Sequence, residues 1–152
     1  GRNLSGGNGT RNDVIQYINI AGSTGDASDW GDSTTESMDA GQGLEDASRG
    51  VLALGNVVST YYVTAAMDYI ATSNSSGSGS DFGDLVQEQK MTMGISDGTN
   101  GEFWGGATSG SGGSSDLDMI QKITIDSTGD AADTGDNLVQ VADRVGGCSG
   151  SQ

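Results

Sequence analysis

The chain has 152 residues with 21 acidic and 6 basic side chains, no His and one Cys, giving a formal net charge of −15. This charge argues against nucleic acid as a partner, since nucleic-acid affinity comes largely from Lys and Arg neutralising phosphates. The missing His and the lone Cys remove the usual zinc ligands, and no apolar run approaches the roughly 20 residues that span a bilayer. We therefore expect no cofactor and no membrane insertion.

Three short segments rich in β-branched and aromatic residues are predicted strands. They cover residues 14–20, 67–72 and 119–125, and each is followed by Ser, Thr, Gly and Asp, which favour turns. The chain also has 27 glycines and no proline, a composition that suits continuous sheets joined by tight turns. The predicted fold class is all-β.

A four-residue word recurs after each predicted strand. It reads Asp-Trp-Gly-Asp from Asp29, Asp-Phe-Gly-Asp from Asp81 and Asp-Thr-Gly-Asp from Asp133, so that the copies are 52 residues apart. A glycine four residues before each word keeps the same step. A period near 50 with about four short strands per repeat is typical of β-propeller blades rather than of helical repeats.

The two ends of the chain complement each other. The element at residues 49–55 recurs at residues 100–106, but the third copy stops before it, and residues 1–7 at the other end have its character. We expect one repeat domain over residues 1–152, in which a strand within residues 1–10 completes a blade. Its repeats are expected at about 11–55, 56–106 and 107–152.

Three repeats are too few to close a propeller, which typically has about 4–8 blades. We therefore expect half of a six-bladed ring. The other half comes either from a second chain or from a longer parent chain.

The residues around the repeated word resemble the kelch-like repeats of marine and cyanobacterial phage virion and tail-fibre proteins. The likeness rests on residues 17–32, 48–51, Tyr69, Phe82 and 104–106. Thr134 departs from it, because it takes the place of the aromatic residue in the third word. The resemblance implies a kelch-like propeller in an extracellular virion, with no reaction attached, because propellers host unrelated functions.

Acidic residues spaced three apart flank the glycine of the repeated four-residue words, and this spacing suggests a calcium site. The candidate acids are Asp26, Asp29, Asp32, Asp130, Asp133 and Asp136. Calcium prefers six to eight oxygen ligands from flexible loops, but this spacing is not that of an EF-hand. Asp side chains also commonly accept hydrogen bonds from backbone amides in turns. We favour the turn role and predict no metal.

A glycine-free segment at residues 57–63 is the most apolar run of the chain. As a loop it would expose a contact surface for a partner. The candidate contact residues are Val57, Val58, Tyr61, Tyr62 and Val63. Alternatively the segment extends the following strand and packs in the core, and the two interpretations have equal weight.

Two neighbouring aromatic residues and one arginine complete the candidates. Phe103 and Trp104 could stack on sugar rings, but aromatic residues dominate core burial in small sheets, so we favour packing between blades. Arg49 precedes a predicted strand, and its planar guanidinium suits a fixed ion pair or hydrogen bonds to loop carbonyls.

The function expected from these features is a non-enzymatic structural or adhesion module of a phage virion: a fibre, a spike or a capsid decoration. Its partners would be other copies of itself, other virion proteins and host-surface glycans. The alternative is a secreted or surface-displayed bacterial carbohydrate-binding propeller. A polysaccharide hydrolase is less expected. Such an enzyme needs two carboxylates about 5–9.5 Å apart, and no pattern in the sequence singles out a pair for this role.

Overall fold

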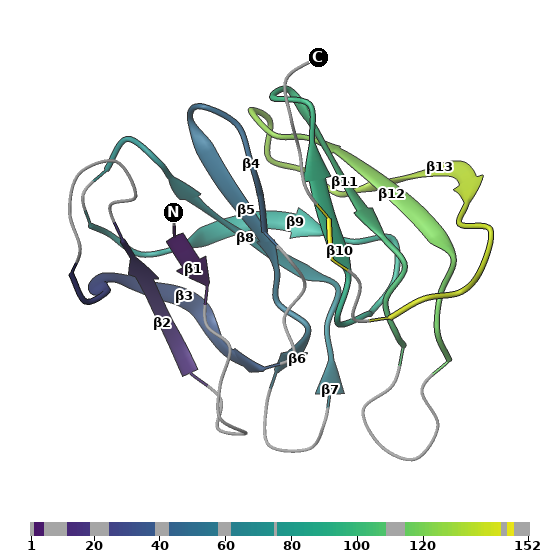
Figure 1. Cartoon of the computed structure of the whole chain (residues 1–152), viewed down its shortest axis with the longest axis horizontal. Helices are drawn as coiled ribbons and strands as arrows, with labels where there is room; N and C mark the ends of the chain where they lie inside the picture. The colour runs from purple at the N-terminus through teal and green to yellow at the C-terminus, as the bar shows by residue number, and fades with distance from the viewer. Residues whose placement is uncertain are drawn as a thin grey trace.

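The computed structural model describes residues 2–4, 12–18, 25–38, 43–57, 62–74, 76–108, 115–143 and 146–147. Within this part of the chain the secondary structure consists of strands, arranged in three antiparallel sheets (Figure 1). The predicted all-β class is therefore confirmed. Among these residues no helix is long and apolar enough to cross a membrane.

The first sheet contains the strand nearest the N-terminus. Its spatial order is β1 (Arg2–Leu4), β2 (Asn12–Tyr17), β3 (Ser28–Met38), β6 (Asn56–Val57) and β7 (Tyr62–Val63). Because β1 pairs with β2, the N-terminal strand expected within residues 1–10 joins the sheet of its own chain's first word. The end of β3 continues past that word and pairs with β6.

The middle and last sheets are up-and-down meanders of the same form. The middle sheet has the order β4 (Gly43–Glu45), β5 (Arg49–Ala53), β8 (Ala66–Ala71) and β9 (Ser80–Asp84). The last sheet has the order β10 (Met93–Ser96), β11 (Asn100–Trp104), β12 (Met119–Thr124) and β13 (Ala132–Asn137). The middle sheet spans residues 43–84, so it crosses the expected repeat boundary between residues 55 and 56.

The repeated words lie in β3, β9 and β13. Strands β9 and β13 are edge strands of their sheets, whereas β3 lies between β2 and β6. In β3 the register shifts at Trp30, and in β9 it shifts at Phe82, so both aromatic residues occupy a β-bulge. A bulge bends a strand and turns its side chain out of the regular alternation. Both rings are buried, and Trp30 donates its indole N–H to the Asn74 carbonyl at 3.1 Å.

Two apolar clusters fill the spaces between the sheets. The larger one joins the middle and last sheets, with Val51 and Met67 packed among Phe103 and Ile123. The smaller one joins the first and middle sheets through Ile15, Trp30 and Ile70. Each sheet is therefore held to the next by burial of apolar surface, the largest favourable term in folding.

The first and middle sheets are also joined by backbone hydrogen bonds. Gly77 donates its N–H to the Trp30 carbonyl at 2.8 Å, and Gly79 donates to the Asp32 carbonyl at 2.6 Å. Gly31, between the two acceptors, has a φ of 142°, and a Cβ there would lie 1.4 Å from the Gly77 carbonyl oxygen. The word needs glycine here because of both its backbone conformation and this close approach.

The middle and last sheets repeat this junction 52 residues later. Gly129 donates its N–H to the Phe82 carbonyl at 2.7 Å, and Ala131 donates to the Asp84 carbonyl at 2.7 Å. Gly83 has a φ of 138°, and a Cβ there would lie 2.4 Å from the Gly129 carbonyl oxygen. The same four backbone groups and the same glycine thus make both junctions.

One side chain of each following sheet reaches back across the junction. Asp68 Oδ2 accepts the Thr34 backbone N–H at 2.6 Å, and Gln121 Oε1 accepts the Val86 backbone N–H at 2.6 Å. Both acceptor side chains are buried. The donors are 52 residues apart and the acceptors 53, so this contact also recurs at the repeat period.

Candidate binding surface

The first acid of each word accepts a hydrogen bond from the backbone N–H two residues further along its own strand. Asp29 Oδ1 accepts the Gly31 N–H at 2.9 Å, Asp81 Oδ1 accepts the Gly83 N–H at 3.1 Å, and Asp133 Oδ1 accepts the Gly135 N–H at 2.8 Å. Asp29 and Asp133 therefore accept backbone amides as expected, but they do so within strands β3 and β13 rather than in turns. Among the described residues, no group of three or more Asp, Glu, His or Cys side chains is placed to hold a metal ion.

Asp130 has a different task from the other candidate acids. Its Oδ1 accepts the Asp84 backbone N–H at 3.0 Å, across the junction between the middle and last sheets. The sequence showed this carboxylate as one of a local series, whereas its partner is 46 residues away. It therefore helps to hold two sheets together.

Two further acids, Asp46 and Asp97, organise the tips of the β4–β5 and β10–β11 hairpins. Asp46 Oδ1 accepts the backbone N–H groups of Ser48 and Arg49, both at 2.6 Å. Asp97 Oδ1 accepts the N–H groups of Thr99 at 2.9 Å and Asn100 at 2.7 Å. These residues were not candidates from the sequence, although the pattern Asp-x-Ser/Thr-x-Gly recurs there with a step of 51 residues.

The hydrogen bonds keep both carboxylates ionised. Burial alone raises the pKa of Asp46, but the amide N–H groups of Arg49 and Ser48 outweigh it, so the pKa lies below its ordinary value. At Asp97 the amide N–H of Asn100 lowers the pKa most. Each hairpin tip thus carries a fixed negative charge above mildly acidic pH.

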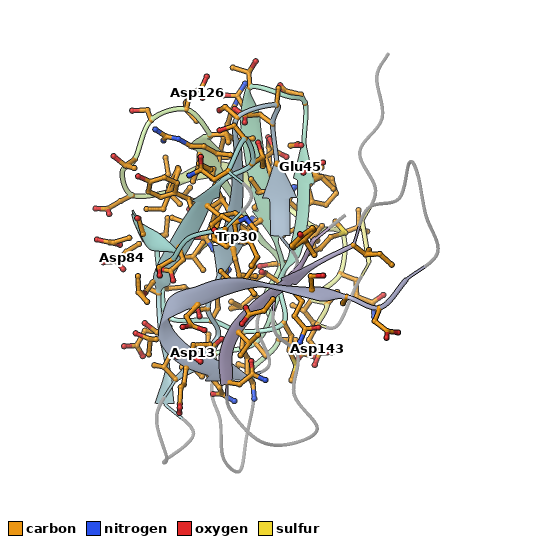
Figure 2. The ribbon with its side chains drawn as sticks, turned by 90° about the vertical axis from the view of Figure 1, so that its left-hand side faces the viewer. Asp13, Trp30, Glu45, Asp84, Asp126 and Asp143 are labelled. Atoms are coloured by element: carbon orange, nitrogen blue, oxygen red, sulfur yellow. The ribbon has the colours of Figure 1, made fainter. Side chains whose placement is uncertain are left out.

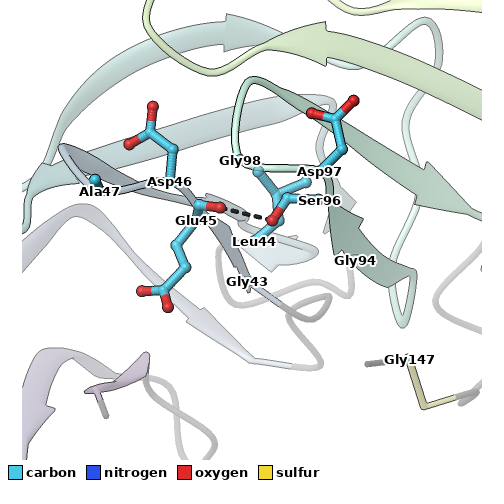
Figure 3. A pocket seen from close by; sticks show the side chains of 10 residues that line it. All are labelled: Gly43, Leu44, Glu45, Asp46, Ala47, Gly94, Ser96, Asp97, Gly98 and Gly147. Atoms are coloured by element: carbon cyan, nitrogen blue, oxygen red, sulfur yellow. Dashed lines mark hydrogen bonds between the residues drawn. The ribbon is translucent and has the colours of Figure 1, made fainter. Parts of the chain in front are cut away.

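A groove of about 650 Å³ lies between the two hairpins, lined by residues 43–47 on one side, by Gly94 and residues 96–98 on the other, and by Gly147. Ser96 Oγ donates to the Glu45 carbonyl at 2.6 Å and ties the two hairpins together. Figure 3 shows Asp46 and Asp97 on the two opposite hairpins, with both carboxylates pointing upward and that of Glu45, beside Asp46, pointing downward. The groove therefore has an acidic rim.

The β4–β5 tip is also bound to the last sheet. Ser48 Oγ donates to Asp126 Oδ1 at 2.7 Å, and Arg49 Nη1 donates to the Ile125 carbonyl at 3.3 Å. The Arg49 guanidinium lies 4.7 Å from the centre of the Tyr69 ring, which adds a cation–π contact. The loop-carbonyl role predicted for Arg49 is confirmed. Figure 2 shows Glu45 and Asp126 at one end of the molecule and Asp13 and Asp143 towards the other.

The structure divides the predicted contact segment. Val63 in β7 is only 4% exposed, so its side chain packs inside, as the core alternative predicted, and Val57 in β6 is half-buried. The backbone of Tyr62 pairs with Val57. Val58 and Tyr61 lie outside the described residues, and a partner contact there stays a prediction.

The two aromatic candidates on β11 face opposite sides of the last sheet. Phe103 is fully buried in the larger core, so packing between sheets is the correct alternative for it. Trp104 is half-buried and donates its indole N–H to Glu102 Oε2 at 2.8 Å. Stacking of Trp104 on a sugar stays a prediction.

No model of a known protein family and no curated protein matches the chain. A proposal for its function therefore stands on the residues described above.

Proposed function

We propose that the chain is a kelch-like propeller module of a phage virion that catalyses no reaction and serves as a structural or adhesive part of a fibre, a spike or a capsid decoration. The like strand order of the middle and last sheets, and the same backbone contacts at both junctions, support the propeller arrangement, because a propeller is a ring of four-stranded sheets. The resemblance of residues 17–32 to phage virion repeats supports the setting.

The observation that carries the adhesive role is the pair of like hairpin tips on either side of the groove. Asp46 and Asp97 are each locked by two backbone amides, so their outer carboxylate oxygens are held in fixed positions. Carboxylate oxygens accept hydrogen bonds and donate none, and they suit hydroxyl groups of neutral glycans. A net charge of −15 disfavours acidic polysaccharides.

A single groove of this kind binds weakly, because its rim is open and polar. Display of many copies on a particle turns weak contacts into useful avidity, since each binding event after the first becomes intramolecular. The rigid sheets serve this purpose by holding the hairpin tips in constant geometry. The proposed mechanism is therefore multivalent presentation.

The test compares the chain coupled at high density to beads with the chain free in solution, on arrayed neutral and acidic polysaccharides and on whole bacterial cells. We expect retention of the beads on neutral glycans, weak or no retention of free chains, and a loss of at least tenfold for the double variant Asp46→Asn and Asp97→Asn. Asp13→Asn, at the other end of the molecule in Figure 2, is the matched control. Failure of the beads to bind any glycan or cell would overturn the adhesive role.

One observation favours the carbohydrate-binding alternative, in which a bacterial propeller holds sugar on an aromatic side chain. Trp104 keeps part of its indole exposed, and its N–H is fixed by Glu102. Glycan binding that survives the Asp46 and Asp97 changes but is lost in Trp104→Ala would support this alternative. Release of reducing sugar from any of the polysaccharides would contradict the non-enzymatic proposal.

A further inference from the structure

The last sheet covers one face of the middle sheet. The corresponding face of the last sheet points away from the middle sheet and is only partly buried. In the middle sheet the apolar residues Leu44, Ala53 and Met67 are buried beneath the last sheet. The residues that hold the same places in the last sheet, Ile95, Trp104 and Ile120, are only half-buried. Glu102 and Lys122 stand where the middle sheet has Val51 and Tyr69, and Gly147 lies against the Ile95 side chain. This face is therefore partly apolar, and no described sheet covers it.

The opposite face of the first sheet shows the same difference. Ile70 in the middle sheet and Ile123 in the last sheet are each 4% exposed, and each packs towards the sheet that precedes it. Ile18 holds the corresponding place one period earlier and is 45% exposed. The apolar residues that correspond to those of a junction are thus more exposed at both ends of the stack than inside it.

The third word has a glycine at the same place, although the φ of Gly135 is 78° against 142° at Gly31 and 138° at Gly83. A Cβ on Gly31 or Gly83 would meet the carbonyl of Gly77 or Gly129 from the next sheet. Gly135 is the glycine of the third word, and nothing described lies within 4 Å of its Cβ position. The place that a glycine carbonyl fills at both internal junctions is open here.

Backbone N–H groups equivalent to the donors of the internal junctions lie near the other end of the chain. Gly25 and Ala27 stand 52 residues before Gly77 and Gly79, the donors of the first junction. In the third word, the carbonyls of Thr134 and Asp136 stand 52 residues after those of Phe82 and Asp84, which accept the backbone hydrogen bonds of the second junction. No hydrogen bond between described residues joins Gly25 or Ala27 to another sheet.

We infer that a second copy of this chain fills these places, so that the first sheet of one copy stacks on the last sheet of the next, head to tail. Gly25 then donates its N–H to the Thr134 carbonyl of the next copy, and Ala27 donates to the Asp136 carbonyl. The Gly25 carbonyl lies over Gly135, and Ile18 packs towards Trp104. This joint deepens the proposed module by naming the partner that completes its ring, and it rests on that proposal.

A side-chain contact fits the same joint. The tripeptide Leu-Val-Gln at residues 85–87 recurs at 138–140, and Val86 donates its N–H to Gln121 at the junction of the middle and last sheets. Val139 is the equivalent donor and is fully exposed, while Gln16, the equivalent acceptor, is exposed on β2. Gln16 has the same side chain as Gln121, so a second copy supplies the matching amide oxygen.

The two faces are different surfaces, so the contact is heterologous and leaves a donor face and an acceptor face on every open assembly. Such contacts close into a ring where the rotation permits and otherwise extend into a filament. Face-to-face pairing would bring Ile18 against its own copy and leave the Thr134 and Asp136 carbonyls without the matching donors. The repeat of the junction therefore favours head-to-tail stacking.

The test measures the mass of the full chain by sedimentation and light scattering. We expect assemblies of two or more copies for the wild type and monomers for Gly135→Asn, whose side chain would occupy the place of the Gly25 carbonyl. Asn tolerates the φ of 78° at this position, and no described atom obstructs it. Gly98→Asn is the matched control, because Gly98 has a φ of 88°, open space around it and a place at a hairpin tip.

A second variant makes the direction of stacking testable. Ile18→Glu blocks the other face and should also give monomers, whereas an equal mixture of Gly135→Asn and Ile18→Glu should give one-to-one dimers, because each retains the face that the other has lost. A monomeric wild type, or a mixture that stays monomeric, would overturn the joint. Wild-type assemblies that bind no glycan would overturn the adhesive role alone, and monomers that bind glycan would overturn the joint alone.

Discussion

At the scale of single residues, Asp68 has the most unusual environment among the described acids. It is buried at the junction of the first and middle sheets and accepts hydrogen bonds from the Thr34 N–H at 2.6 Å and the Thr34 hydroxyl at 2.7 Å. Burial raises its pKa, the bonds from Thr34 lower it, and the charge of Asp81 raises it further, with a net increase above 3.8. The neutral Gln121 holds the same position at the next junction.

The raised pKa of Asp68 predicts a definite pH dependence of stability. The folded state holds this proton more tightly than the unfolded state, so the stabilising contribution is full below pH 3.8 and is lost as the pH rises through the higher folded pKa. We expect the unfolding free energy of the wild type to fall relative to that of Asp68→Asn over this window. Urea unfolding at several pH values measures the difference, and a difference independent of pH would contradict the assignment.

At the scale of elements, the hairpins matter more than their weak sequence signal suggests. The three apolar runs were correctly predicted as strands and are β2, β8 and β12, within a few residues at their ends. The elements predicted at residues 49–55 and 100–106 contain β5 and β11, but β4 and β10, which complete the two hairpins, were missed. Gly and polar residues interrupt the alternation there, and the acids at the hairpin tips have no signal that separates them from other surface acids. The extension of β3 was missed for a related reason: its buried Ser37 is polar and pairs with β6 from a distant part of the chain.

The β4–β5 hairpin should depend on the carboxylate of Asp46. Asp46→Ala removes the acceptor of two backbone N–H groups and should cost about 1 kcal/mol. Because the tip is local, faster amide hydrogen exchange should be confined to β4 and β5, with β10 and β11 unchanged. Asp46→Asn retains an oxygen acceptor and should exchange almost as the wild type does. Equal acceleration in both hairpins would instead indicate a general loss of stability.

At the scale of the whole molecule, the sequence period predicted more of the arrangement than any local pattern did. The contacts between sheets recur at the same step of 52 or 53 residues, but the period alone did not predict them, and it could not show that glycine in the word is required by a carbonyl of the next sheet. That requirement depends on distances between Gly31 and Gly77 or between Gly83 and Gly129, which only the folded chain establishes. For the same reason the groove between the hairpins was not predicted.

The net charge of −15 should make stability depend on ionic strength. Repulsion among the acids opposes the compact state, and salt screens it over a distance of about 10 Å at 0.1 M. We expect the melting temperature to rise by several degrees from low to moderate NaCl, and CaCl2 to act only as its ionic strength requires. Thermal unfolding in matched salts, with EDTA as the control, measures this. A larger rise with micromolar Ca²⁺ would reveal a specific cation site.

The junction between sheets has a consequence for how such a chain can change over generations. Docking uses main-chain groups, one small residue and a buried apolar contact, so the fit carries over to any neighbour built on the same plan. A whole unit could be duplicated or deleted without new surfaces having to be invented, while hairpin tips vary independently. The number of sheets in an assembly and the binding specificity of the hairpin tips can thus evolve separately.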